Sequence, residues 1–290
     1  MNMHIPVLLK EAIELLNPQP GQVFVDGTFG GGGHTKEIWE KIQPKGRLLA
    51  IDWNEKAIKI CQDKFEGVDC VVANFTAIPE LLEKYDYPQI DGLILDLGFS
   101  SNELEKSGRG FSFMNDEPLL MTYNDEQKPV MEIIAETDEE ELANIIYKYG
   151  EERHSRKIAY VIKKEHKSDP IVTSKRLAEI VKRAVPQSYK KSRIHPATRT
   201  FMALRIYANQ ELENLELLLD NLYKIMAPQG RIAVISFHSL EDRIVKTIFK
   251  QLSKEGLFEE ITKKVIKPSE EEIKDNPRAR SAKLRGALVK

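Results

Sequence analysis

Short apolar runs alternate with helix-sized amphipathic segments along the first third of the chain. The runs cover residues 23–26, 47–52, 69–75 and 90–96, and a fifth follows at 231–235. Runs that are apolar at successive positions are typical of parallel strands buried on both faces, and the segments between them have the period of a helix. The pattern therefore predicts an α/β fold in which βαβ units build a doubly wound sheet.

The alternation stops at residue 108 and resumes after residue 206. Between these points the apolar positions recur with helical spacing, and helices are expected at 142–149, 152–166, 174–185 and 196–208. The chain is therefore expected to hold two domains, namely an α/β domain formed by residues 1–107 and 207–290, and an inserted all-helical subdomain at 108–206.

Four consecutive glycines follow the first predicted strand. After Asp26 the chain reads Gly-Thr-Phe and then Gly30-Gly31-Gly32-Gly33-His34. Backbone without Cβ atoms approaches a bound molecule closely and adopts positive φ without steric cost. The stretch thus predicts a ligand-binding turn that leads into a helix. A flexible hinge is the structural alternative for such a glycine run.

An acid that closes the second predicted strand indicates the class of cofactor. In βαβ units an acid at the position of Asp52 accepts hydrogen bonds from ribose hydroxyls. The dinucleotide pattern G-x-G-x-x-G does not fit the glycine run, whereas D-x-x-x-G-x-G fits Asp26, Gly30 and Gly32. This spacing favours S-adenosyl-L-methionine over a nicotinamide dinucleotide, because a sulfonium and an ammonium group tolerate carboxylates such as Asp26 and Asp96.

Polar residues end the remaining predicted strands at the same edge of the sheet. Asn74 and Phe75 are placed to contact an adenine by hydrogen bonding and stacking, and burial of Phe75 in the core is the alternative. Asp96 opens a loop where it either faces the reacting group or caps the next segment. Ser236 and His238 follow the fifth strand, where a histidine is either a catalyst or a hydrogen-bonded structural residue.

Composition and charge narrow the class of protein. The 290 residues are 41% hydrophobic and 30% charged, which is typical of a soluble globular protein, and neither a membrane-spanning run nor a signal peptide is recognisable. A cytosolic location follows as an expectation. Cys61 and Cys70 lie in apolar contexts and are expected to be reduced core residues. The six histidines show no metal-ligand spacing with cysteine, so no metal site is expected.

The formal net charge of -2 conceals a basic block. Residues 151–205 contain 15 lysines and arginines against 5 acidic residues. Such a block is either a solvated helix face or a site for a polyanion. Cations and aromatic rings interleave at its end in the mixture expected for RNA binding: Lys190, Lys191, Arg193, Arg199 and Arg205, with Tyr189, His195 and Phe201.

Several stretches are more distinctive than the glycine turn alone. They read HIPVLL (4–9), DGTFGGGGH (26–34), LDLG (95–98), GRGFSFM (108–114), YGEER (149–153), HPATRTF (195–201), ISFHSLEDRIVK (235–246) and NPRAR (276–280). With them the chain resembles, over almost its full length, the bacterial 16S ribosomal RNA cytosine-N4 methyltransferases. The resemblance implies a Rossmann-like class I methyltransferase that uses S-adenosyl-L-methionine. It also implies a helical insert that recognises RNA and, as substrate, a cytidine in the decoding region of the small ribosomal subunit.

The resemblance also implies site residues. Carried over by position, the cofactor contacts are Gly32, Gly33, His34, Asp52, Phe75, Asp96 and Glu103. Two departures from the family pattern stand out. Asn102-Glu103 replaces the usual Pro-Gln, and Leu120 and Thr122 replace an Asp and an Arg.

The expected chemistry is attack by the exocyclic amine of a cytosine on the methyl group. This nitrogen is a poor nucleophile because its lone pair is delocalised, so we expect Asp96, with groups near Ser100 and Ser236, to accept the amine hydrogens. Asp96, Ser236 and His238 are the candidate catalytic residues. A non-catalytic RNA-binding or ribosome-assembly protein and a nicotinamide-dependent oxidoreductase remain the alternatives, and the sequence leaves the oligomeric state open, a homodimer included.

Overall fold

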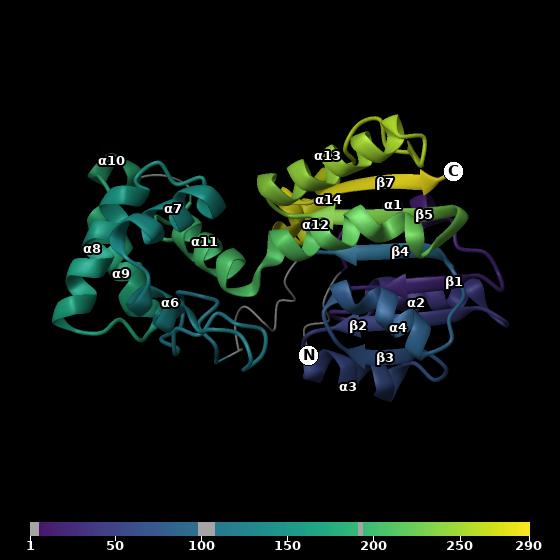
Figure 1. Ribbon diagram of the computed structural model, residues 1–290, viewed down its shortest axis with the longest axis horizontal. Coiled ribbons are helices and arrows are strands. Elements are labelled where there is room, and N and C mark those ends of the chain that lie inside the picture. Colours follow the sequence, from purple (N-terminus) through teal and green to yellow (C-terminus); the bar gives the residue numbers. More distant parts are fainter. Residues whose placement is uncertain (1–5, 98–107, 191–193) are drawn as a thin grey trace. The chain divides into compact units, whose positions relative to one another are not determined.

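The computed structural model describes residues 6–97, 108–190 and 194–290. The chain divides into two compact units (Figure 1). The sheet unit comprises Met1–Ser100 and Leu212–Lys290, and the helical unit comprises Ser101–Glu211. The helical unit ends at Glu211, a few residues after the expected boundary at residue 206. The last helix of this unit runs to Asn209, and Glu211 forms an ion pair with Arg205 of that helix.

A seven-stranded sheet forms the centre of the sheet unit. Its strand order is β3-β2-β1-β4-β5-β7-β6. The first five strands pair in parallel, whereas β7 is antiparallel to both β5 and β6. The strands are β1 (Val23–Asp26), β2 (Arg47–Asp52), β3 (Asp69–Val72), β4 (Ile90–Asp96), β5 (Met226–Ser236), β6 (Phe258–Glu260) and β7 (Lys283–Val289). The strand order reverses between β1 and β4, which is the switch point where ligands bind to open α/β sheets.

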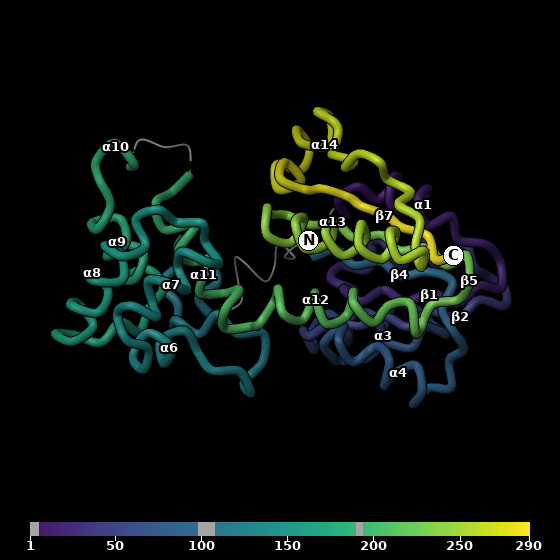
Figure 2. The backbone as a smooth tube through the Cα atoms, turned by 45° about the horizontal axis from the view of Figure 1, so that its top comes forward, coloured from purple at the N-terminus to yellow at the C-terminus, as the bar shows by residue number. Residues whose placement is uncertain are grey.

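Helices cover both faces of this sheet (Figure 2). Successive strand residues point to opposite faces, so Phe24 packs with α1 and α2, whereas Val25 packs with α4, α12 and α13. The helices of this unit are α1 (Leu9–Leu16), α2 (Gly33–Ile42), α3 (Glu55–Lys64), α4 (Ile78–Lys84), α12 (Glu211–Asn221), α13 (Ser239–Lys254) and α14 (Glu270–Asp275). The predicted α/β fold is confirmed.

The second unit is helical in the part that the structure describes. It contains α6 (Val130–Glu136), α7 (Glu139–Gly150), α8 (Ser155–Ser168), α9 (Ser174–Ala184), α10 (Gln187–Lys190) and α11 (Thr198–Asn209). Helix α7 packs against both α8 and α11, and its buried side chains recur at helical spacing. Across the described ranges of both units, no helix combines the length and the apolar character that a bilayer span requires.

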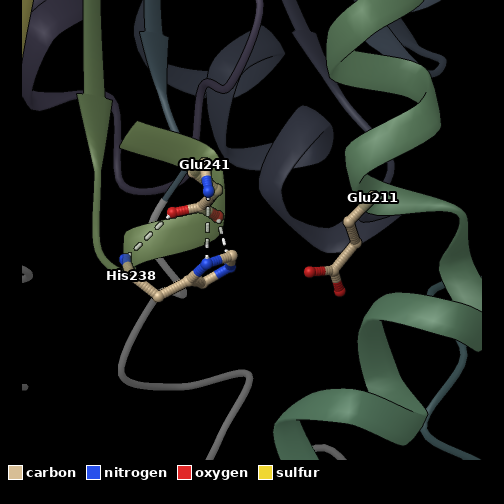
Figure 3. A group of neighbouring side chains, drawn as sticks. All are labelled: Glu211, His238 and Glu241. Atoms are coloured by element: carbon tan, nitrogen blue, oxygen red, sulfur yellow. Dashed lines mark hydrogen bonds and ion pairs between the residues drawn. The ribbon is translucent and has the colours of Figure 1, made fainter. Parts of the chain in front are cut away.

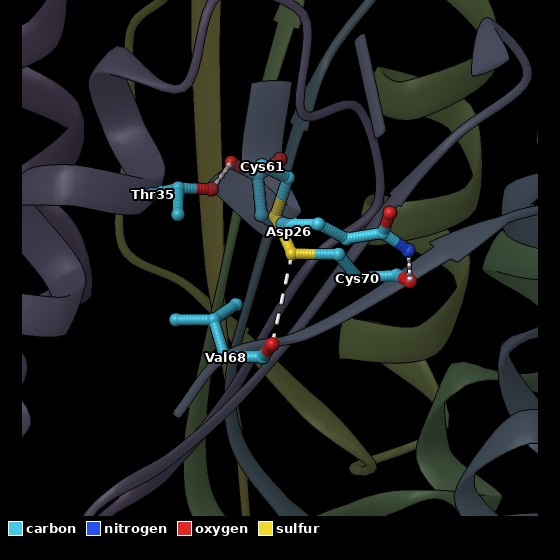
Figure 4. The surroundings of a disulfide bond; sticks show 6 residues. Asp26, Thr35, Cys61, Val68 and Cys70 are labelled. Atoms are coloured by element: carbon cyan, nitrogen blue, oxygen red, sulfur yellow. Dashed lines mark hydrogen bonds between the residues drawn. A yellow bond between two sulfur atoms is a disulfide. The ribbon is translucent and has the colours of Figure 1, made fainter. Parts of the chain in front are cut away.

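The two cysteines form a disulfide, which corrects the expectation that they are reduced. Figure 4 shows the Cys61–Cys70 bond, which joins α3 to β3. Packing of α3 on β3 brings the two Cα atoms to 6.0 Å, which is within the range that a disulfide bridges. Sequence spacing alone did not reveal this approach.

Two short elements form near the C-terminus. The segment at 257–267 forms a strand over Phe258–Glu260. The acidic segment after it contains α14, because the Ser269 side chain accepts a hydrogen bond from the Glu272 N–H and starts a helix with three glutamates in its first turn.

Candidate functional site

The turn after β1 is held by hydrogen bonds from Asp26. This carboxylate is buried, at 1% exposure, and accepts hydrogen bonds from the Thr35 hydroxyl at 2.7 Å and the Thr28 N–H at 3.1 Å. Burial raises the pKa of Asp26 to about 6, and these two hydrogen bonds oppose the rise. Asp26 therefore fixes the shape of the turn, and Thr28 and Thr35 are positioning residues that the sequence analysis missed.

The glycine run connects this turn to the acid at the end of β2. The Gly30 N–H donates to Asp52 Oδ2 at 2.7 Å, and the Asn54 N–H donates to Asp52 Oδ1 at 2.9 Å. Gly30 and Gly32 have φ of 53° and 77°, a left-handed conformation that favours glycine. A Cβ at Gly32 would also lie 2.7 Å from the ring of Phe29. The backbone therefore carries no Cβ atom at Gly30, whose N–H donates to Asp52.

Asp96 lies at the carboxyl end of β4, one strand from β1. Its N–H donates to the Thr28 hydroxyl at 2.6 Å, and its Oδ2 lies 3.9 Å from His34 Nδ1. His34 is buried, and its Nε2 lies 3.2 Å from the carbonyl oxygen of Val7. A carbonyl only accepts, so Nε2 carries a proton. The imidazole of His34 thus faces the protein, linking the segment before α1 to Asp96.

The residues after β3 form a short capped turn. The Asn74 side chain accepts a hydrogen bond from the Thr76 N–H at 3.0 Å and caps a 3-10 helix at Phe75–Ala77. Phe75 is half-buried, and a Cβ added at Gly27 would lie 3.3 Å from the Cβ of Phe75. Phe75 therefore borders the turn after β1 and stays a predicted cofactor contact, whereas the Asn74 amide oxygen acts within its own loop.

His238 has a structural function at the start of α13. Its Nδ1 accepts a hydrogen bond from the Glu241 N–H at 3.4 Å, and Glu241 Oε2 accepts one from the His238 N–H at 3.2 Å (Figure 3). This reciprocal pattern is a capping box. His238 Nε2 also lies 3.1 Å from Glu241 Oε1. The Ser236 hydroxyl is buried and donates to the Lys283 carbonyl oxygen at 3.4 Å. Ser236 and His238 stay predictions as catalytic residues.

The residues at the carboxyl edge of the sheet fit a methyl donor that carries an adenosyl group and a positive charge. Asp52, Phe75 and Asp96 are each partly exposed, whereas the strand residues before Asp52 and Asp96 are largely buried. Two carboxylates stabilise a nearby sulfonium, an aromatic ring offers a stacking face, and the glycine turn leaves room for close backbone approach. The residues present therefore fit S-adenosyl-L-methionine.

Comparison with known proteins decides the family. A profile of the MraW methylase family matches residues 1–289. The chain belongs to this family. Ribosomal RNA small subunit methyltransferase H of Coprothermobacter proteolyticus is 44% identical over 286 residues, which cover 97% of this chain and 94% of that protein. The protein of the same name from Ehrlichia chaffeensis is 45% identical over 298 residues, which cover 99% of both chains.

A solved structure supports the fold of the methylase. The crystal structure of a putative rRNA-methylase from Clostridium thermocellum superposes with a TM-score of 0.50 at 11% sequence identity, covering 99% of each chain. At this identity the likeness concerns the fold alone. Membership of a methylase family confirms the predicted Rossmann-like methyltransferase fold and the predicted methyl donor, S-adenosyl-L-methionine.

Of the positions that depart from the family pattern, Asn102 and Glu103 lie outside the described residues, as does Ser100, which was expected near the reacting amine. Thr122 of the methylase is buried, and its hydroxyl accepts a hydrogen bond from Arg109 Nη2 at 2.7 Å, while its carbonyl accepts from Arg109 Nε at 2.6 Å. Thr122 therefore anchors the Gly-Arg-Gly segment, and nothing in the structure explains Leu120.

Most of the basic cluster singled out from the sequence makes contacts within the helical unit. Arg205 forms an ion pair with Glu211 at 2.8 Å, and Arg199 Nη1 donates to the Glu151 carbonyl oxygen at 3.2 Å. Phe201 is buried, and Phe113 stacks on His195 with ring centroids 4.5 Å apart. These contacts stabilise the unit itself. Lys191 and Arg193 lie outside the described residues.

Proposed function

We propose that this methylase transfers a methyl group from S-adenosyl-L-methionine to N4 of a cytidine in the decoding region of 16S ribosomal RNA. The observation that carries the proposal is the carboxylate of Asp96, which lies beside the glycine turn at the edge of the sheet. The names of the relatives support a substrate in the small subunit of the ribosome. A cytoplasmic location follows from that substrate.

The proposed methyl transfer follows from the residues at the carboxyl edge of the sheet. Bound S-adenosyl-L-methionine supplies a methyl group activated by its sulfonium. Asp96 accepts a hydrogen bond from the cytosine amine, which bends the nitrogen toward tetrahedral geometry and directs its lone pair at the methyl carbon. As the nitrogen–carbon bond forms, the amine acquires positive charge, and Asp96 takes the proton that leaves. Thr28 and His34 hold Asp96 in place through its backbone and its carboxylate.

A labelled methyl assay tests the proposal. Small subunits from a strain that lacks this modification are incubated with the wild-type methylase and radiolabelled S-adenosyl-L-methionine, and the RNA is digested to nucleosides. We expect the label in N4-methylcytidine at a single site. Label in another nucleoside would refute the N4 assignment, and absence of label with intact RNA binding would favour the alternative of a non-catalytic assembly protein.

RNA recognition by the helical unit is supported by one face of α8. Its exposed side chains are those of Arg156, Lys157, Tyr160, Lys164 and Lys167, which fall within a sector about 100° wide along roughly 16 Å of helix axis. Tyr160 is 50% exposed. Within the part of the chain that the structure describes, none of these four cations has an ion pair. A cationic stripe around an exposed ring is suited to phosphates and an unstacked base.

The position of the charges argues that α8 is not optimised for stability. Arg156 and Lys157 lie in the first turn, where the helix dipole disfavours cations, and this turn has no acidic residue. By contrast, α7 begins with three glutamates, and Arg176 and Arg183 of α9 are paired with Asp169 and Glu165. An external polyanion is therefore the better explanation for the unpaired stripe.

Charge reversal on this stripe is expected to weaken binding of the RNA. Arg156→Glu together with Lys164→Glu should lower the affinity for small subunits about tenfold and reduce the dependence of affinity on salt, because about two phosphate contacts are lost. The affinity for S-adenosyl-L-methionine should not change. Filter binding across a salt series measures the first effect and calorimetry the second.

A matched control is available on α3, in the sheet unit. Lys59 and Lys64 are exposed, and neither has an ion pair among the described residues. Lys59→Glu with Lys64→Glu changes the net charge by the same amount. If this control loses as much affinity as the α8 variant, net charge rather than a local contact is responsible, and the α8 stripe is not a binding surface.

A further inference from the structure

A basic hollow lies next to the catalytic edge, within the sheet unit. Its volume is about 370 Å³, and it is formed where β5 ends, α13 begins and β7 starts. The side chains used below are those of Phe237, His238, Lys267, Arg280, Ser281 and Lys283. None of the residues that line the hollow is acidic. Three cations thus converge on one concave surface.

The charges around the hollow are only partly compensated. Lys283 Nζ lies 3.0 Å from Asp242 Oδ2, and Arg285 Nε lies 2.7 Å from Asp242 Oδ1, so one carboxylate serves two cations. These cations lower the pKa of Asp242, and its burial opposes them. Lys267 and Arg280 are exposed, and their side chains have neither a hydrogen bond nor an ion pair within the described part of the chain. The hollow therefore carries a net positive charge.

The other polar groups of the hollow are occupied or neutral. Glu241 accepts hydrogen bonds from the Phe237 and His238 N–H groups, so the backbone donors just before α13 are used inside the protein. Phe237 is partly buried and packs against the core between α1 and the sheet. An anion in the hollow would thus be held by the side chains of Lys267, Arg280 and Ser281, and not by the helix dipole alone.

The strand register fixes the distance from the hollow to Asp96. Asp96 pairs with Ile235 on β5, and Ser236 pairs with Lys283 on β7. Neighbouring strands are about 4.8 Å apart. The hollow therefore begins within one to two strand spacings of Asp96, roughly 5–10 Å away on the same edge of the sheet. A nucleotide spans a comparable distance from its base to its phosphate.

We infer that this hollow binds a phosphodiester of the substrate RNA, adjacent to the nucleotide whose base reaches Asp96. The inference rests on the proposed function. A base that leaves its stack must be held by its backbone as well as by its ring. Lys267 and Arg280 neutralise the phosphate next to the extruded nucleotide and so set the position of the amine relative to the methyl donor.

Charge reversal in the hollow tests the inference. Lys267→Glu with Arg280→Glu should raise KM for small subunits about 10- to 100-fold, because two charge-assisted contacts to one phosphate are replaced by repulsion. The slope of log KM against log salt concentration should decrease by about the amount that one phosphate contact contributes. Affinity for S-adenosyl-L-methionine should be unchanged, and so should KM in the control with Lys59→Glu and Lys64→Glu.

The outcomes separate this inference from the proposed function. If the wild-type methylase modifies small subunits and the hollow variant does so with an unchanged KM, the inference is wrong and the function stands. If the wild type modifies no RNA, binding of a single-stranded RNA oligonucleotide is compared between wild type and variant, and equal affinities overturn the inference. Competitive inhibition of the wild type by millimolar inorganic phosphate, with equally strong inhibition of the variant, would place the anion site elsewhere.

Discussion

Replacing Asp96 by asparagine is expected to slow methyl transfer about 1000-fold, since a general base contributes on the order of 10²–10⁴ in rate. The amide keeps the size of the carboxylate but loses the charge that takes up the proton from the amine. Single-turnover transfer of a labelled methyl group to small subunits measures the effect. The free energy of unfolding should change by less than about 1 kcal/mol, because the backbone hydrogen bond from Asp96 to Thr28 remains.

The same strand provides the control for this experiment. Asp91 lies at the amino end of β4, and its Oδ2 accepts a hydrogen bond from the Val23 N–H at 2.8 Å. Asp91→Asn is chemically the same change at the opposite edge of the sheet. It should leave the transfer rate intact. A variant with Asn at position 96 that transfers methyl at the wild-type rate would remove Asp96 from the mechanism.

The strands of the site were predictable because burial on both faces leaves little choice of residue. Continuous apolar runs that stop at Asp26, Asp52 and Asp96 became β1, β2 and β4, with each acid at the last residue of its strand. The glycine turn was predictable for a related reason, since positive φ excludes most other residues. Parallel pairing then brings the three strand ends to one edge.

Side-chain partners were less predictable, because they depend on neighbours distant in sequence. The sequence did not predict that His34 Nε2 lies 3.2 Å from the carbonyl oxygen of Val7, and the contact of His34 with the cofactor stays a prediction. His238 was a candidate catalyst, and the cap it forms with Glu241 involves a carboxylate three residues away, so a capping-box search that included histidine would have found it. The pairing of Arg205 with Glu211 shows how a basic cluster read from sequence is divided between fold contacts and free surface.

The location of the basic surfaces was also not predictable from the sequence. The surplus of lysine and arginine over residues 151–205 indicated a polyanion site but not its location. In the folded chain the cations of α8 lie on one exposed face and have no ion pair in the described ranges. By contrast, Arg176 and Arg183 of α9 are paired with acids. The basic hollow was not predictable for a different reason, because Lys267 approaches Lys283 through a long-range pairing of Ile266 with Leu284.

Asp26 couples the stability of the sheet unit to pH. Burial raises its pKa from 3.8 to about 6, despite hydrogen bonds from Thr35 and Thr28. The native state therefore binds the proton more tightly than the unfolded state does. Between about pH 4 and pH 6 the native state carries more protons, so the contribution of Asp26 to stability decreases as the pH rises through this window. A shift of this size corresponds to about 3 kcal/mol, which the protein loses when Asp26 ionises.

Asp26→Asn removes this titration and should change the pH dependence of stability. Relative to wild type, the free energy of unfolding of the variant is expected to increase by about 3 kcal/mol between pH 4 and pH 7, because only the wild type must bury a charge at the higher pH. Urea unfolding at intervals of one pH unit measures the difference, and Asp63→Asn, at an exposed position on α3, controls for the general loss of a carboxylate. A difference between the position-26 variant and wild type that stays constant with pH would show that Asp26 has the same pKa in the folded and the unfolded protein, and that its hydrogen bonds from Thr28 and Thr35 offset the cost of burial.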